Sequence, residues 1–194
     1  YQDAGDQFSE TYKVYSELNL SNGTVGGKIS GKAWYDRVLN RENVDLGSPN
    51  SGATRATAYA AVGGGYDGRL NDSGASRLSK FDGVYLLDAY AFVNADVANM
   101  PVQVRAGRQA VNWGESIFFQ GVNQISPLDV GSLRRAGSEI KEALLPIWSL
   151  TANVGLPGGV SMDMFYQFQW APTELEACGT FWAGSTNISA RPGN

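Results

Sequence analysis

The sequence predicts an all-β protein, and within that class a partial antiparallel transmembrane β-barrel of about six strands, with a short helix in an inward-folded loop. Three observations lead to this prediction. Apolar and polar residues alternate over long runs, which is the pattern of a strand with one apolar and one polar face. Short turns alternate with long connections along the chain. Aromatic residues lie near the ends of the runs, where outer-membrane barrels carry interfacial girdles.

Residues 10–20 and 24–35 predict the first hairpin. In both runs, apolar side chains recur at alternate positions and polar ones fill most of the positions between them. The turn is Ser21-Asn22-Gly23, and Asn-Gly is the strongest short signal for a hairpin. The apolar positions are Tyr12, Val14, Leu18, Leu20, Val25, Ile29, Ala33 and Tyr35, and the polar positions include Lys13, Glu17, Asn19, Thr24, Lys28, Ser30 and Lys32.

Residues 84–94 and 102–108 predict the second hairpin, with Met100-Pro101 closing the turn region. In its second arm Arg105 is in phase with Gln103, so both side chains lie on the polar face. The predicted faces of the first arm are Tyr85, Leu87, Ala89, Ala91 and Val93 on one side, and Asp88, Tyr90, Phe92 and Asn94 on the other.

Residues 147–156 and 160–170 predict the third hairpin, joined by the tight turn Pro157-Gly158-Gly159. The alternation is clearest here, and only Phe165 interrupts it. Each run is about twice the usual strand length of 5–6 residues. It matches the 9–11 tilted residues, approximately, that cross a bilayer core.

The alternative interpretation of the alternation is a soluble β-sandwich with one solvated face. Strand length, aromatic placement and turn lengths favour the barrel, because outer-membrane barrels have short turns on one rim and long loops on the other. Six strands cannot close a barrel, since eight is the usual minimum. We therefore expect residues 1–194 to be a portion of a single larger outer-membrane barrel. The short turns are 21–23, 95–100 and 157–159, and the long connections are 36–83, 111–146 and 171–194.

The connection 111–146 is too apolar for a free external loop. We expect it to fold into the barrel lumen and to constrict or plug it. Within it, Ser138 is placed to cap a short helix formed by the residues from Glu139 to Leu145, which Pro146 stops.

Charged residues gather around this connection. A charged strand facing acidic loop residues is a way in which channel constrictions screen solutes. The alternative is a structural arginine–carboxylate network that pins the loop, and the sequence leaves both open. The candidate lumen residues are Arg105, Arg108, Trp113, Glu115, Asp129, Arg134, Arg135, Glu139 and Glu142.

Composition excludes several other classes of function. The 194 residues include no His and one Cys, so the usual zinc, thiolate and serine–histidine sites cannot be built. A net charge of −4 without a basic tract does not suit nucleic-acid binding. Glu115 and Asp129 are the only carboxylate pair we considered for catalysis, and nothing fixes their geometry. We predict a protein that is not an enzyme and has no cofactor or metal.

Several segments in order resemble a large family of uncharacterised outer-membrane proteins of Gram-negative bacteria, which carries a domain-of-unknown-function label. The resemblance covers roughly residues 84–183, whereas residues 1–83 match only in style. The segments that carry it are Leu86-Leu87-Asp88-Ala89, Arg105-Ala106-Gly107-Arg108-Gln109, Asn112-Trp113-Gly114-Glu115-Ser116, Asn123-Gln124-Ile125-Ser126-Pro127-Leu128-Asp129, Lys141-Glu142-Ala143-Leu144-Leu145-Pro146, Tyr166-Gln167-Phe168-Gln169-Trp170 and Cys178-Gly179-Thr180-Phe181.

The resemblance implies a bacterial outer-membrane location, contact with outer-membrane lipid and lipopolysaccharide, and a larger barrel. It also implies an encoding near exporters of the resistance-nodulation-division type and an outer-membrane lipoprotein, hence a periplasmic or lipoprotein partner. The expected function is a channel or transporter for hydrophobic or lipid-like solutes. The alternative is a structural or adhesive barrel whose long external loops bind a partner.

Overall fold

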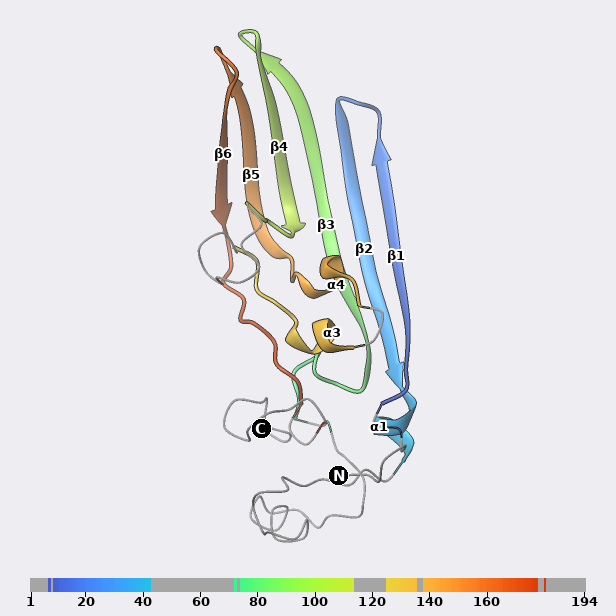
Figure 1. The fold of residues 1–194 in the computed structure, drawn as a ribbon. Coiled ribbons are helices and arrows are strands. Elements are labelled where there is room, and N and C mark those ends of the chain that lie inside the picture. The colour runs from blue at the N-terminus through green and yellow to red at the C-terminus, as the bar shows by residue number, and fades with distance from the viewer. Residues whose placement is uncertain are drawn as a thin grey trace.

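The computed structural model describes residues 7, 9–42, 72, 74–113, 125–135, 138–177 and 180. They form one antiparallel sheet of six strands, in which each strand pairs with the next along the chain (Figure 1). The prediction of an all-β antiparallel fold is confirmed, and within the described residues the sheet is open, with β1 and β6 at its edges. The strands are β1 Thr11–Ser21, β2 Val25–Asp36, β3 Asp82–Val97, β4 Met100–Gln109, β5 Ile147–Leu156 and β6 Val160–Gln167.

The three short turns lie together at one end of the sheet, and the long connections leave from the other (Figure 1). In the first turn the Asn22 side-chain oxygen accepts hydrogen bonds from the main-chain N–H groups of Thr24 and Val25. The second turn is shorter than predicted. Met100 and Pro101 belong to β4, and the turn is Ala98-Asn99, whose φ angles of 52° and 63° are those of a type I′ hairpin turn.

The described residues form three short helices toward the end of the long connections: α1 Arg37–Arg41, α3 Val130–Arg134 and α4 Ile140–Ala143. The prediction for α4 was partly wrong. The Ser138 hydroxyl donates to the carbonyl of Arg135 and does not cap the helix. The helix ends at Ala143 because Leu144 forms a β-bridge with Leu128. None of the helices in the described ranges is long and apolar enough to cross a membrane.

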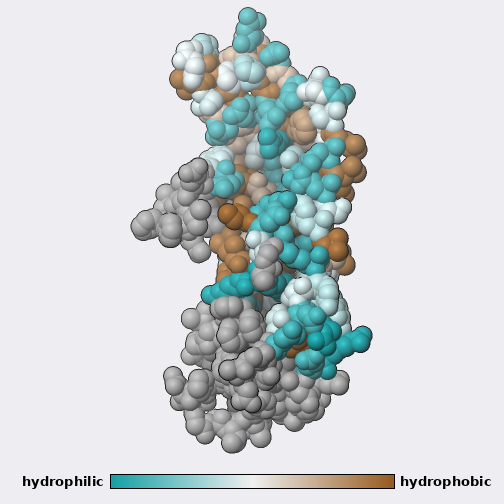
Figure 2. All heavy atoms as spheres, turned by 45° about the vertical axis from the view of Figure 1, so that its right-hand side comes forward, coloured by the Kyte–Doolittle hydropathy of each residue, from teal (hydrophilic) through white to brown (hydrophobic). Residues whose placement is uncertain are grey.

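The apolar face of the sheet is exposed, and its polar face is covered toward the end of the long connections. On β2, Ser30, Lys32 and Trp34 are buried, whereas Val25 and Ile29 are 48% and 49% exposed. Figure 2 shows hydrophobic groups along the right-hand margin of the molecule and a hydrophilic band down its middle. The exposed apolar side chains also include Tyr12, Val14, Leu18, Leu20, Val84, Leu86, Val93, Trp148, Leu150, Val160, Met162, Met164 and Tyr166.

A β-bulge in β3 changes which side chains share a face. Ile29 pairs with Ala89, but two residues further along β2 Gly31 pairs with Leu86, so β3 has one extra residue there. Leu86 is consequently 45% exposed and Leu87 only 1%. The prediction that Tyr85 and Leu87 share a face with Ala89, Ala91 and Val93 was therefore wrong, because strict alternation cannot register an inserted residue.

The hydrophobic core is small and lies at the end of the long connections. One cluster contains Trp34, Leu78 and Leu145, with Tyr85 packed against it. The Trp34 ring N–H donates to the carbonyl of Lys80 at 2.9 Å. A second cluster contains Val38, Phe81 and Ala177. Leu87, Val111 and Ile147 are buried outside these clusters. Among the described residues, the sheet therefore packs against its connecting segments at this end.

Gly107 should be the least replaceable glycine of the sheet. Its φ is +135°, and a Cβ there would lie 2.5 Å from the Ala89 carbonyl oxygen and 2.7 Å from the Tyr90 Cα. We expect Gly107→Ala to lower the free energy of unfolding by about 2–4 kcal/mol, from backbone strain plus overlap. The matched control is Gly158→Ala, where φ is +86° and no atom lies within 4 Å. It should cost about 1 kcal/mol. Urea unfolding measures both, and equal costs would contradict the overlap argument.

Candidate functional site: the polar face and the segment that covers it

Lys32 is the centre of the contact between the sheet and the segment 125–146. Its side chain is 5% exposed, and its ammonium donates three hydrogen bonds. The acceptors are Asp129 Oδ2 at 2.8 Å, Ser132 Oγ at 2.6 Å and the main-chain oxygen of Glu142 at 3.0 Å. An ammonium has three N–H donors, so the buried charge is fully satisfied.

Asp129 both binds the Lys32 ammonium and caps the N-terminus of α3. Its Oδ1 accepts the main-chain N–H of Ser132 at 3.0 Å, which caps α3, while its Oδ2 accepts the Ser132 hydroxyl at 2.6 Å and the Lys32 ammonium. The Asp129 side chain is only 3% exposed. A carboxylate with this many donors is stable as an anion away from water.

Lys13 on the neighbouring strand holds the second helix. Its Nζ lies 3.0 Å from both carboxylate oxygens of Glu142, whose side chain is 7% exposed. The two helices are also tied to each other, because the N–H of Asp129 donates to the carbonyl of Ala143 at 2.8 Å. Lysines from β1 and β2 therefore clamp α3 and α4 onto the polar face of the sheet.

Toward the turns, the polar face continues as a ladder of paired side chains. Lys28 lies 3.1 Å from Glu17 and 3.2 Å from Asp88, and Ser30 donates to Asp88 at 3.1 Å. These residues come from three adjacent strands, so the ladder runs across the sheet. The polar face is thus densely hydrogen-bonded even where no helix covers it.

The structure brings together only some of the residues that the sequence predicted. Asp129 and Glu142 meet at the lysine clamp, and the Arg135 guanidinium lies 5.7 Å from the Trp34 ring beside it. Arg134 pairs with Glu176 at 2.7 Å, and Glu139 pairs with Lys141 at 2.9 Å, both near the surface. The hydrogen bond to Glu139 raises the pKa of the Lys141 ammonium. Glu115 lies outside the described residues.

Arg105 and Arg108 stand apart from the clamp. The Arg105 guanidinium lies 5.8 Å from the Tyr90 ring, and its Nε donates to Gln103 at 2.8 Å. The Arg108 guanidinium lies 4.8 Å from the Tyr85 ring and donates to the Tyr85 hydroxyl at 2.5 Å. Within the described part of the chain, neither arginine has a carboxylate partner. Both rest on tyrosine rings instead.

Trp113 packs edge-on against Phe165, with ring centroids 5.0 Å apart and an interplanar angle of 87°. Phe165 is directly opposite Thr151 in the pairing of β5 and β6. The residue that interrupts the alternation of β6 is therefore the one that receives Trp113 on the polar face.

Sequence reasoning placed Lys13 and Lys32 on the polar face but did not select them as site residues. The available signal was their position on two paired strands, facing a connection rich in Asp and Glu. Ser132 carried no such signal, because its contact with Lys32 depends on how α3 docks. No group of three or more His, Cys, Asp or Glu side chains in the described ranges is arranged to hold a metal ion.

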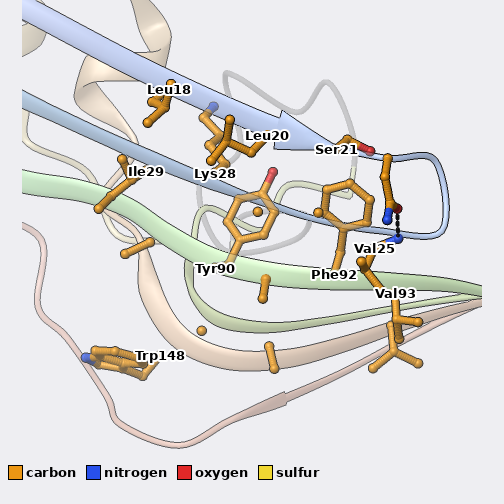
Figure 3. Close-up of a pocket in the computed structure, with 18 residues that line it drawn as sticks. Leu18, Leu20, Ser21, Val25, Lys28, Ile29, Tyr90, Phe92, Val93 and Trp148 are labelled. Carbon is orange, nitrogen blue, oxygen red and sulfur yellow. Dashed lines mark hydrogen bonds between the residues drawn. The ribbon is translucent and has the colours of Figure 1, made fainter.

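An open hollow lies on the apolar face of the sheet (Figure 3). Small residues on the central strands form its floor, namely Gly27, Ala89, Ala91 and Ala106, and larger side chains on either side form its walls, namely Leu18, Leu20, Val25, Ile29, Val104 and Trp148. The lining is mostly apolar, and Lys28, which also lines it, is paired with Glu17 and Asp88, so the hollow offers few groups that would orient a polar ligand.

The described residues thus place the chain among all-β proteins: they form a long antiparallel sheet with an exposed apolar face and a polar face that a connecting segment partly covers. Residues 1–193 match the family described as "Protein of unknown function (DUF1302)", and the chain belongs to that family. The match confirms that the chain belongs to an uncharacterised domain-of-unknown-function family, and it extends the similarity over the first 83 residues. No curated protein and no solved structure matches the chain.

Removing the Lys32 ammonium should release the segment 125–146. Lys32→Met leaves Asp129 buried without its cation, which should cost about 3–5 kcal/mol of stability. We expect faster trypsin cleavage after Arg134 and Arg135 in the full-length protein. The matched control is Lys141→Met, whose ion pair with Glu139 is exposed and screened by solvent, so its loss should hardly change the cleavage rate.

A double variant separates the charge effect from a general loss of packing. Lys32→Met with Asp129→Leu removes both charges, so cleavage should be slower than in Lys32→Met alone. Equal cleavage in Lys32→Met and Lys141→Met would contradict the clamp.

Proposed function

We propose that this chain forms part of the wall of a bacterial outer-membrane β-barrel that conducts solutes, with its apolar face against lipid and its polar face toward the lumen. The observation that carries the proposal is the arrangement of the two faces. A soluble β-sandwich buries its apolar faces and exposes its polar ones. Here the connecting segment covers Lys32, and Ser30 is also buried, while Val14 and Leu20 are 68% and 65% exposed.

Strand length and aromatic placement support the same orientation. Five of the six strands have 10 to 16 residues, enough to cross a bilayer core when tilted. Outward aromatic residues lie at the end of the long connections, and aliphatic residues such as Leu20 and Val160 lie at the turn end. The outward aromatic residues would then form the interfacial girdle at one rim of the barrel, the rim of the long connections. The aromatic residues are Tyr12, Tyr35, Trp148, Tyr166, Phe168 and Trp170.

In this proposal the segment within 111–146 that carries α3 and α4 is the constriction of the lumen. Its clamp by Lys13 and Lys32 supports a lumen-side position, since it lies on the face away from lipid. The open edges at β1 and β6 leave room for further strands, and a closed barrel needs at least about eight. The surroundings would be outer-membrane lipid and lipopolysaccharide.

The family resemblance supports the solute class and the partner. Members encoded near exporters and an outer-membrane lipoprotein suggest hydrophobic or lipid-like solutes and a periplasmic or lipoprotein partner. No catalytic residue is part of the proposal.

The test is to remove the constriction and record conductance. Leu128 and Leu144 are bridge partners, so the ends of the excised piece lie close together. We therefore expect the full-length protein to fold with residues 129–143 replaced by Gly-Gly. Single-channel conductance in planar bilayers should rise at least about twofold, because a constriction dominates the resistance of a pore. Unchanged conductance would remove the constriction from the proposal.

Membrane location has its own measurement. The full-length protein should appear in the outer-membrane fraction and should migrate faster on a gel before heating than after it, as closed barrels do. Recovery as a soluble monomer in detergent-free buffer would overturn the proposal.

A structural or adhesive barrel is the second candidate, and the buried clamp favours it. Side chains that are 5% and 3% exposed hold the segment in place, which suits a permanently closed lumen. A heat-modifiable barrel without conductance in either form would support this candidate against the channel.

A further inference from the structure

Five cations lie on the described strands, and they divide into two kinds. The three lysines each have a carboxylate partner: Lys13 with Glu142, Lys28 with Glu17 and Asp88, and Lys32 with Asp129. The two arginines, Arg105 and Arg108, have none among the described residues. A cation on a polar face without a counter-charge is a place where an anion is favoured.

The guanidinium of Arg105 is held in place but only partly used. Its Nε donates to Gln103, and the group lies 5.8 Å from the Tyr90 ring. No described residue accepts a hydrogen bond from its two terminal amino groups. A planar guanidinium with free terminal N–H groups matches the two oxygens of a carboxylate or phosphate.

Aromatic rings flank this guanidinium on the same face. The strand registers place Phe92, Arg105, Thr151 and Phe165 in one row across β3 to β6. Phe92 lies against Gly26, where a Cβ would be only 2.5 Å from the ring. Figure 3 shows Tyr90 and Phe92 side by side on β3, with Val93 pointing the opposite way.

At the other end of the row Trp113 and Phe165 form an edge-to-face pair in which both residues stay accessible, at 45% and 38% exposed. The next row toward the turns contains Asn94, Gln103, Asn153 and Asp163, and its polar side chains bind one another. Gln103 donates to Asn94, and Asn153 donates to Asp163. The Asp163 carboxylate is thus engaged by an amide, and it does not neutralise Arg105.

We propose that this row binds an amphiphilic anion: a carboxylate or phosphate on Arg105, attached to an apolar chain or ring that lies on Phe165 and Trp113. The site rests on the proposed function in that the polar face must be open to the lumen. It deepens that function by specifying a charged head on the hydrophobic solute. The apolar hollow is lined by Lys28, but that cation is already paired with Glu17 and Asp88, whereas Arg105 has no carboxylate partner among the described residues.

The test compares short-chain ligands that partition weakly into lipid. Binding of octanoate and of octyl phosphate to the full-length protein in phosphatidylcholine nanodiscs is measured by titration calorimetry. Arg105→Gln should weaken binding of the anion roughly tenfold or more. Arg105→Lys should recover part of the affinity, because it retains the charge but not the fork. Octanol should bind weakly and equally to the wild type and to Arg105→Gln.

The matched control is Arg134→Gln, an exposed arginine paired with Glu176, which should bind as the wild type does. Binding of octanoate alone would identify carboxylates as the ligand, and binding of octyl phosphate alone would identify phosphate esters such as lipid headgroups. Either outcome supports the site. Equal affinity of the wild type and Arg105→Gln for both anions, or octanol binding as tightly as octanoate, would overturn it.

A second variant tests the apolar half of the site without touching the charge. Trp113→Ala should weaken octanoate by roughly three- to tenfold and leave heat-modifiable migration unchanged. Unchanged octanoate affinity would remove Trp113 from the site. Anion binding without conductance would overturn the channel and keep the site, whereas conductance without anion binding would overturn only the site.

Discussion

The docking of α3 and α4 on the sheet depends on the hydrogen bonds of the buried Lys32 ammonium. A charge that is 5% exposed is stable only with its acceptors in place, and those acceptors come from α3 and from the end of α4. The three acceptors therefore fix where both helices dock. The same Asp129 that neutralises Lys32 also caps α3, so formation of the helix and docking of the segment are one event.

This contact explains why the polar face of the sheet is the covered one. The segment from 125 to 146 has apolar residues, but at the sheet it presents carboxylates, a serine hydroxyl and main-chain oxygens. Such a surface is complementary to lysines and would lose hydration without compensation on the Leu- and Val-rich face. Charge complementarity thus determines that the segment docks on the polar face. The apolar face remains exposed, which is the basis of the proposal that it lies against lipid.

The sequence predicted the six strands and their turns well because both signals are local. Alternation and Asn-Gly report on neighbouring residues, and these elements follow from them. The β-bulge at Leu87 was missed because one inserted residue reverses the phase without changing composition. The second turn was predicted as longer than Ala98-Asn99 because Met100-Pro101 was interpreted as part of it, whereas both residues belong to β4. The site was harder, since the contacts of Lys32 join residues about 100 positions apart.

The division between lysines and arginines on the strands follows from their chemistry. An ammonium is compact and strongly hydrated, so it is well placed in a closed cage of three acceptors, as Lys32 is. A guanidinium is planar and more weakly hydrated, and it can rest on an aromatic ring while its outer edge stays free. Arg105 on Tyr90 has this geometry. Lys13 and Lys32 consequently account for how the segment is held, and Arg105 is the cation of the polar face that has no carboxylate partner among the described residues.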